Sequence, residues 1–149
     1  MEITSNGAYP SRSLSNFAGH RFTFDDVECN SMEGFLQSLK WKSTDMQPEI
    51  CKLVGIGAKR RGYKKNWWTK QELYWKGKAY PRKSKEYKEL IAAAYDALFE
   101  CSESFRNALK AAGKANFTHN IGKIKEHETI LTRSEFINNL NRLRDNMGS

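Results

Sequence analysis

A carboxylate, an amide and an amine recur at helical spacing between Ser31 and Trp41. Glu33, Gln37 and Lys40 stand at i, i+4 and i+7, so a helix would place them on one face. A carboxylate on such a wall can stabilise positive charge that develops on a substrate, or deprotonate an attacking water. The same pattern fits an ordinary amphipathic helix, in which Glu33 interacts favourably with the helix N-terminus.

Caps and apolar periodicity predict the helices that would position this wall. Phe35, Leu36 and Leu39 give the first helix an apolar stripe, and Asn30 or Ser31 can cap it. Further helices are predicted from Asp45 toward Gly57, from the capping box Thr69–Glu72 through Leu73 and Trp75, from Ser84 to Leu98, from Ser102 to a stop at Gly113, and from the capping box Thr132–Glu135 onward.

The strand signals are few. Alternation over 21–24, followed by Asp25-Asp26 and 27–29, predicts a small hairpin, and 115–118 is predicted as a strand or an extended loop. The predicted fold class is therefore α+β, mainly helical with a small β element. Because no repeat or long linker interrupts the chain, residues 1–149 are expected to form a single domain, with 147–149 consistent with a cloning remnant.

Positive charge is concentrated in one segment of a chain whose net charge is +8. Between Lys52 and Lys85 the lysines and arginines are opposed only by Glu72. Such a segment attracts a nucleotide phosphate, a polynucleotide or an acidic partner, although a solvated surface is the plainer alternative. Trp67 and Trp68 lie inside the segment, and we expect one to be buried and the other to line a pocket.

The cysteines and the N-terminus exclude several classes of protein. Cys29, Cys51 and Cys101 are odd in number and lack CxxC spacing or paired histidines, so neither a disulfide framework nor a zinc site is predicted. All three are expected to be buried thiols, and no metal or cofactor is expected. Residues 1–9 lack signal-peptide features and no segment has the apolar length of a membrane span, so a cytoplasmic protein without a membrane partner is expected.

Two motifs in register resemble the NADAR (YbiA-like) family. Ser31-x-Glu33-x-x-x-Gln37-x-x-Lys40, followed by Trp41, resembles the helix motif of that family, and Leu14-Ser15-Asn16-Phe17 resembles its Ser-Asn-Phe loop. Ala58-x-x-x-Gly62 and Asn66-Trp67 with Trp75 are similar to later family segments. The chain departs from the family in residues 117–123 and 128–132, which lack the Trp-Gly segment that the family commonly carries before its last helix. The resemblance implies that this region forms the far wall of the pocket.

The resemblance implies a YbiA-like fold and a nucleotide-like ligand that contains ribose and phosphate. Members of the family are implicated in cleaving N-glycosidic bonds, in riboflavin-pathway intermediates or in ADP-ribose attached to guanine. The resemblance implies Glu33 as the catalytic carboxylate. Lys40, Lys59 and Lys123 could then bind phosphate oxygens, and Trp67 could stack against a base. The expected substrate-binding residues are Asn16, Phe17, Gln37, Lys40, Lys59, Trp67, His119 and Lys123.

Structural roles for these residues, and other functions for the protein, are alternatives to this expectation. His119 fits a structural histidine better than a base, and His20 has no partner identifiable from sequence. A second carboxylate could come from Asp25, Asp26, Glu126 or Glu128, for which turn and surface roles fit equally well. Because the Trp-Gly segment is missing, a protein that sequesters an ADP-ribose-like nucleotide without cleaving it is one alternative. A nucleic-acid module that uses the basic segment is the other.

Overall fold

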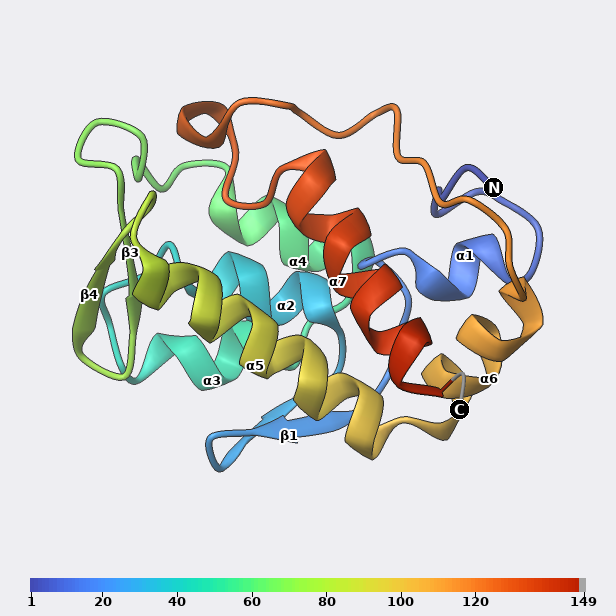
Figure 1. The fold of residues 1–149 in the computed structure, drawn as a ribbon. Helices are drawn as coiled ribbons and strands as arrows, with labels where there is room; N and C mark the ends of the chain where they lie inside the picture. Colours follow the sequence, from blue (N-terminus) through green and yellow to red (C-terminus); the bar gives the residue numbers. More distant parts are fainter. Residues whose placement is uncertain (148–149) are drawn as a thin grey trace.

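Short helices and two β-hairpins alternate along the chain in the computed structural model, which describes residues 1–147. The fold is α+β and mainly helical, as predicted (Figure 1). The elements are α1 (Ser11–Leu14), β1 (Phe22–Phe24), β2 (Val27–Cys29), α2 (Met32–Ser38), α3 (Met46–Cys51), α4 (Gly55–Gly62), β3 (Glu72–Trp75), β4 (Lys78–Pro81), α5 (Lys85–Cys101), α6 (Glu103–Ala112), the 3-10 helix η1 (Glu126–Glu128) and α7 (Arg133–Met147).

Helix α2 lies at the centre of the fold, in contact with α3, α4, α5 and β2. Its predicted cap is confirmed, because the Ser31 hydroxyl accepts a hydrogen bond from the Gly34 amide at 3.0 Å. The same hydroxyl donates to the carbonyl of Leu53 at 2.7 Å, which ties the start of α2 to the segment between α3 and α4. Phe35 and Leu36 are buried in the hydrophobic core, so the apolar side chains of α2 also hold it in place.

Gly34 allows α2 to approach α3 closely. A Cβ at position 34 would lie 2.6 Å from the carbonyl oxygen of Leu53 and 2.9 Å from those of Cys51 and Ile50. These are backbone atoms, which cannot move aside without displacing α3. We therefore expect Gly34→Ala to lower the free energy of unfolding by about 1–3 kcal/mol, measured by urea denaturation. Gly57→Ala is the control, because a Cβ there meets nothing within 4 Å; equal losses in both variants would contradict this account.

The first hairpin is as predicted. Strands β1 and β2 pair antiparallel with Phe22 opposite Cys29, and Asp25 and Asp26 form the turn with φ of 50° and 64°. Such left-handed pairs match the twist of a two-residue hairpin.

The helix predicted from Thr69 is wrong. Residues 72–75 form strand β3, which pairs with β4 so that Leu73 lies opposite Tyr80. The burial of Leu73 and Trp75 has the period of two that a strand requires, and Lys76 and Gly77 both have the positive φ of a tight two-residue turn. The Thr69 hydroxyl donates to Asn66 Oδ1 at 2.8 Å instead of capping a helix.

The helix predicted from Asp45 toward Gly57 is two helices. Val54 is extended (φ −134°, ψ 156°) and Gly55 has φ 55°, which separates α3 from α4. Helix α4 continues to Gly62, beyond the predicted end, and α1 was not predicted at all.

The last three predicted helices are confirmed. Ser84 caps α5 by accepting from the Tyr87 amide at 3.1 Å, and α6 is followed by its C-cap Gly113, which has φ 57°. Both halves of the last capping box are present: the Thr132 amide donates to Glu135 Oε1 at 2.8 Å and the Glu135 amide donates to Thr132 Oγ1 at 3.1 Å. Helices α5 and α7 lie across one face of the molecule (Figure 1).

Residues 113–132 join α6 to α7 along one edge of the molecule (Figure 1). The predicted strand or loop at 115–118 is extended and makes only a single parallel bridge within the described residues, between Glu2 and Thr118. Further on, Arg133 donates to the carbonyls of Asn120 and Gly122, which fixes the segment against the start of α7.

The cysteines and the C-terminal residues differ in part from the prediction. Cys29 and Cys51 are buried, but Cys101 is exposed, so the prediction of three buried thiols is wrong for the last of them. Of the residues proposed as a cloning remnant, Met147 is the last residue of α7, and Gly148 and Ser149 lie outside the described residues. Within residues 1–147 no helix combines the length and apolar character needed to cross a membrane.

Candidate functional site

A cavity of about 510 Å³ opens between the start of α2, helix α4 and the segment that precedes α7. This volume is in the range of sites that hold nucleotide-sized molecules. The structure brings all nine residues expected at the site to its walls, although their roles remain a prediction. They are Asn16, Phe17, Glu33, Gln37, Lys40, Lys59, Trp67, His119 and Lys123.

Glu33 is half-buried in the first turn of α2 and lines the cavity. Its amide donates to the Asn16 carbonyl at 3.0 Å, and its Oε2 accepts from Gln37 Nε2 at 2.6 Å. In the described part of the chain no lysine or arginine forms an ion pair with it. Burial raises the pKa of the Glu33 carboxyl, while the Gln37 hydrogen bond and the charges of Lys59 and Lys40 oppose the rise.

Lys40 reaches the cavity from beyond the helix. Helix α2 ends at Ser38, so Lys40 does not occupy the predicted i+7 position of a continuous helix, although it still lines the same cavity. Burial lowers the pKa of Lys40, the Glu33 carboxylate raises it, and Lys59 lowers it further. Glu33 and Lys40 therefore stabilise each other's charged forms without touching.

The other two predicted cationic residues come from separate elements. Lys59 projects from α4, with its Nζ 5.8 Å from the centre of the Phe17 ring. Lys123 lies in the segment before α7. Three lysines around one enclosed carboxylate give the cavity a positive balance that suits an anion.

Trp67 and Trp68 are not arranged as predicted, with one buried and the other lining a pocket. Trp67 is both buried, with 6% of its surface exposed, and part of the cavity wall, whereas Trp68 is 53% exposed and is not among the lining residues. Trp75 is in the core, where its Nε1 donates to Asp25 Oδ2 at 2.9 Å. Asp25 therefore has a structural role at the hairpin.

His119 and His20 have structural partners. His119 Nδ1 donates to the carbonyl of Ile3 at 2.8 Å, and its ring lies edge-on to Phe136 with centroids 4.9 Å apart. His20, for which the sequence indicated no partner, donates from Nε2 to the Ser13 carbonyl at 2.6 Å and contacts Ser104 through Nδ1 at 2.8 Å. A purely structural role accounts for His20, while His119 also faces the cavity.

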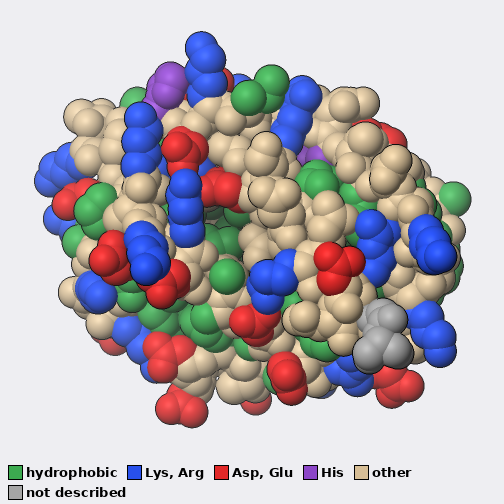
Figure 2. Space-filling view, in the orientation of Figure 1, with side chains coloured by type: hydrophobic (Ala, Val, Ile, Leu, Met, Phe, Trp, Pro, Cys, Tyr) green, Lys and Arg blue, Asp and Glu red, His purple; other side chains and the backbone are tan. Residues whose placement is uncertain are grey.

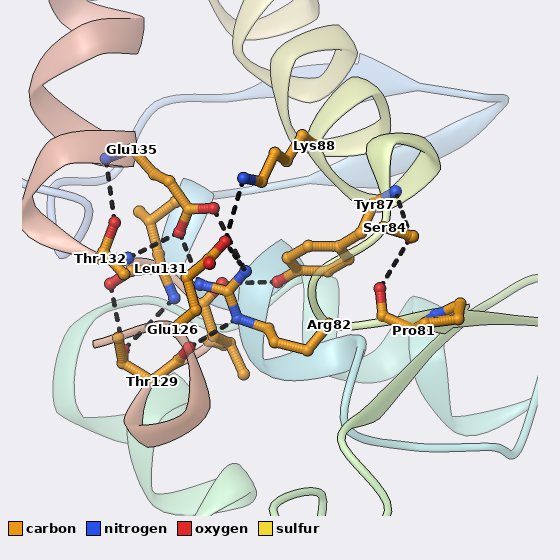
Figure 3. A network of polar contacts seen from close by, with 11 residues as sticks. Pro81, Arg82, Ser84, Tyr87, Lys88, Glu126, Thr129, Leu131, Thr132 and Glu135 are labelled. Carbon is orange, nitrogen blue, oxygen red and sulfur yellow. Dashed lines mark hydrogen bonds and ion pairs between the residues drawn. The ribbon is translucent and has the colours of Figure 1, made fainter. Parts of the chain in front are cut away.

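Residues 128–131 line the cavity, in the segment that was expected to form its far wall, but the contacts that hold this wall were missed from sequence. Arg82, which is 0% exposed, holds this wall in place by donating to the Thr129 carbonyl at 2.7 Å and to both carboxylate oxygens of Glu135 at 2.6 and 3.2 Å (Figure 3). The Tyr87 hydroxyl donates to the Ile130 carbonyl at 2.6 Å.

The two candidate carboxylates of this segment lie in different places. Glu126 forms an ion pair with Lys88 at 3.0 Å, and Glu128 lines the cavity as an exposed residue.

Gly62 sets the position of Gln37. A Cβ at position 62 would lie 1.8 Å from Gln37 Oε1 and 3.0 Å from Lys40 Cδ. We expect Gly62→Ala to displace the Gln37 amide and break its bond to Glu33, which would lower ligand affinity or kcat/KM roughly tenfold.

Gly57→Ala again serves as the control for Gly62→Ala, because it lies in the same helix with open space at its Cβ. It should leave ligand affinity unchanged and stabilise the helix by about 0.5–1 kcal/mol. Affinity measured by calorimetry for both variants decides the point, and an unchanged affinity in Gly62→Ala would show that Gln37 does not serve the site.

Basic and aromatic side chains also meet outside the cavity. The Trp41 ring lies under Lys65 Nζ at 3.7 Å and Arg61 Cζ at 5.4 Å, and Tyr63 is 56% exposed. Figure 2 shows basic side chains spread across one face of the molecule and interleaved with acidic ones.

Known proteins resemble the chain in sequence and in fold. Residues 8–145 match the sequence family described as bacteriophage protein GP30.3. An uncharacterized 17.1 kDa protein of Enterobacteria phage T4, from the Gp30-rIII intergenic region, is 37% identical over 151 residues, which cover 99% of this chain and 98% of that protein. The NMR structure of E. coli YbiA matches with a TM-score of 0.64 at 16% identity, over 99% of this chain and 84% of YbiA. This confirms the YbiA-like fold that the Ser31–Trp41 motif indicated, and at this identity the likeness concerns the fold alone.

Proposed function

The chain belongs to the family of bacteriophage protein GP30.3, and we propose that it is an N-glycosidase acting on a phosphorylated ribosyl ligand. The observation that carries the proposal is the Glu33 carboxylate, which is half-buried at the wall of a 510 Å³ cavity and has no ion-pair partner among the described residues. A carboxyl held in this way is available to a ligand.

The charges around the cavity favour a ligand with phosphate at one end and a sugar at the other. Lys40, Lys59 and Lys123 can meet phosphate oxygens as point charges. Glu33, as the enclosed anion, would repel phosphate and attract a sugar that is gaining positive charge. The ribose of a nucleotide satisfies both conditions.

The reaction follows from that arrangement. As the bond between the anomeric carbon and the base nitrogen breaks, its electron pair leaves with the base and positive charge develops on the ribose. Glu33 stabilises that charge and accepts a proton from the attacking water, whose oxygen forms the new bond to the anomeric carbon. The departing base nitrogen takes up a proton from solvent and Glu33 later returns its proton to solvent, so that the reaction consumes one water molecule and its protons balance. Trp67 offers a flat surface for the base.

Incubation with defined substrates tests the proposal. ADP-ribosylated guanosine and a phosphoribosylated pyrimidine of the riboflavin pathway are the probes, and chromatography detects the released base. The parental protein is expected to release the base, and Glu33→Gln is expected to lose this activity. Tight stoichiometric binding with the ligand recovered intact would support the second candidate, a protein that sequesters an ADP-ribose-like nucleotide.

The exposed aromatic residues of the basic segment favour one further candidate, a nucleic-acid module. Tyr63 and Trp68 are 56% and 53% exposed, and such rings can stack on unpaired bases. Binding to a single-stranded oligonucleotide should then weaken steeply as salt rises. Salt-independent binding, or none, would leave the basic segment as a solvated surface.

A further inference from the structure

Asn16 stands in a loop that is fixed on both sides. The Phe17 amide donates to Ser15 Oγ at 3.2 Å, and the Ala18 amide donates to the Ser15 carbonyl at 3.0 Å. The Asn16 carbonyl accepts from the Glu33 amide. The backbone of Asn16 is thus joined to the residue proposed to be catalytic, and its side chain lines the same cavity.

Tyr95 determines which end of the Asn16 amide remains for a ligand. Its side chain is 0% exposed on α5, and its hydroxyl donates to Asn16 Oδ1 at 2.7 Å. Among the described residues none accepts a hydrogen bond from Asn16 Nδ2. The acceptor end of the amide is therefore occupied, and the donor end is unoccupied beside the cavity.

The hydroxyl of Tyr95 keeps its proton throughout the ordinary pH range. Burial raises the pKa of Tyr95 and the Glu33 charge raises it further, against the effect of the Asn16 hydrogen bond. A protonated hydroxyl remains a donor, so Oδ1 stays occupied and the orientation of the amide does not change with pH.

We propose that Tyr95 is a positioning residue that holds Asn16 as a hydrogen-bond donor toward the cavity, so that the site selects a sugar oxygen able to accept a hydrogen bond beside Glu33. The ligand class rests on the proposed function, whereas the orientation of Asn16 does not. The backbone link between Asn16 and Glu33 places this donor close to the reacting part of the ligand. A ribose hydroxyl or ring oxygen is an acceptor of the required kind.

A double-mutant cycle with ADP-ribose as the probe tests whether Tyr95 acts through Asn16. Calorimetry should show a loss of affinity of roughly 3–10-fold in Tyr95→Phe and a similar loss in Asn16→Ala. In the Asn16→Ala background Tyr95→Phe should cause no further loss. Equal losses in both backgrounds, or no loss in the parental background, would overturn the proposal.

Nuclear magnetic resonance of the ligand-free protein separates this inference from the proposed function. The Asn16 side-chain amide should give one set of signals in the parental protein, and doubled or broadened signals in Tyr95→Phe as the amide samples two orientations. Tyr87→Phe is the matched control, because it removes another fully buried hydroxyl from the same helix, one that bonds Ile130 and not Asn16. Unchanged Asn16 signals in Tyr95→Phe would overturn the inference whether or not ADP-ribose binds.

Discussion

Replacing Glu33 by glutamine is expected to lower kcat by about 10²–10⁴-fold while ligand affinity largely survives, because the amide keeps the shape of the side chain and loses the negative charge. Single-turnover kinetics on the ribosyl substrate would measure the effect. Glu128→Gln is the matched control, since Glu128 also lines the cavity but is exposed. A large loss in Glu128→Gln with parental rates in Glu33→Gln would reverse the assignment.

The pH dependence of Glu33 gives the same hypothesis a second test. Because burial raises the pKa of its carboxyl, the reactive carboxylate should be lost at a higher pH than an exposed glutamate would be. We expect kcat to fall as pH falls through this raised pKa, and the acid limb to be absent in Glu33→Gln.

A stability measurement separates a catalytic Glu33 from a structural one. A carboxyl with a raised pKa in the folded state binds more protons there than in the unfolded state, so it makes the protein less stable as pH rises between the two pKa values. Removing the charge should therefore leave the free energy of unfolding at neutral pH unchanged or higher. A marked loss of stability in Glu33→Gln would indicate that the carboxylate serves the fold.

Replacing Arg82 by methionine is expected to lower the free energy of unfolding by about 3–5 kcal/mol, because the Glu135 carboxylate, whose side chain is 18% exposed, would lose its partner. The Thr129 carbonyl would lose its donor as well, so the far wall of the cavity should loosen and ligand affinity should fall with stability. Urea denaturation and calorimetry measure the two effects.

Two comparisons identify the cause of the Arg82→Met effect. Lys83→Met removes a neighbouring charge that is exposed and should cost little. Arg82→Met combined with Glu135→Gln should be more stable than Arg82→Met alone, because the unpaired charge is gone while an oxygen remains to cap α7. A double variant that is less stable than Arg82→Met would show that the loss comes from packing and not from the unpaired carboxylate.

Helix caps were the structural features most predictable from the sequence. Ser31, Ser84 and the pair Thr132 and Glu135 bond amides within three residues of themselves, so the local sequence is sufficient to define them. The segment at Thr69 shows the limit of this reasoning. Its capping-box pattern is real, but pairing with β4 determined the structure, and strand pairing depends on residues outside the local window.

The candidate site was predictable where its residues belong to a contiguous motif. Glu33 and Gln37 lie on one helix, and the resemblance brought Asn16 and Phe17 to the same place. The resemblance also indicated the segment of the far wall, but the contacts that hold this wall were not predictable, because Arg82 and Glu135 are 53 residues apart in the chain and no local pattern indicates that they form a pair. The role of Tyr95 was hidden for the same reason, since its apolar neighbours on α5 indicated only a core position.

The position of the ligand's sugar relative to Glu33 decides whether Glu33 can act as the catalytic carboxylate. A crystal structure of Glu33→Gln with bound substrate would measure it directly. We expect the side chain at position 33 to lie about 3–3.5 Å from the anomeric carbon, with the phosphates near Lys40, Lys59 and Lys123. A structure in which the phosphates lie against position 33, or in which the sugar lies outside the cavity, would contradict the account.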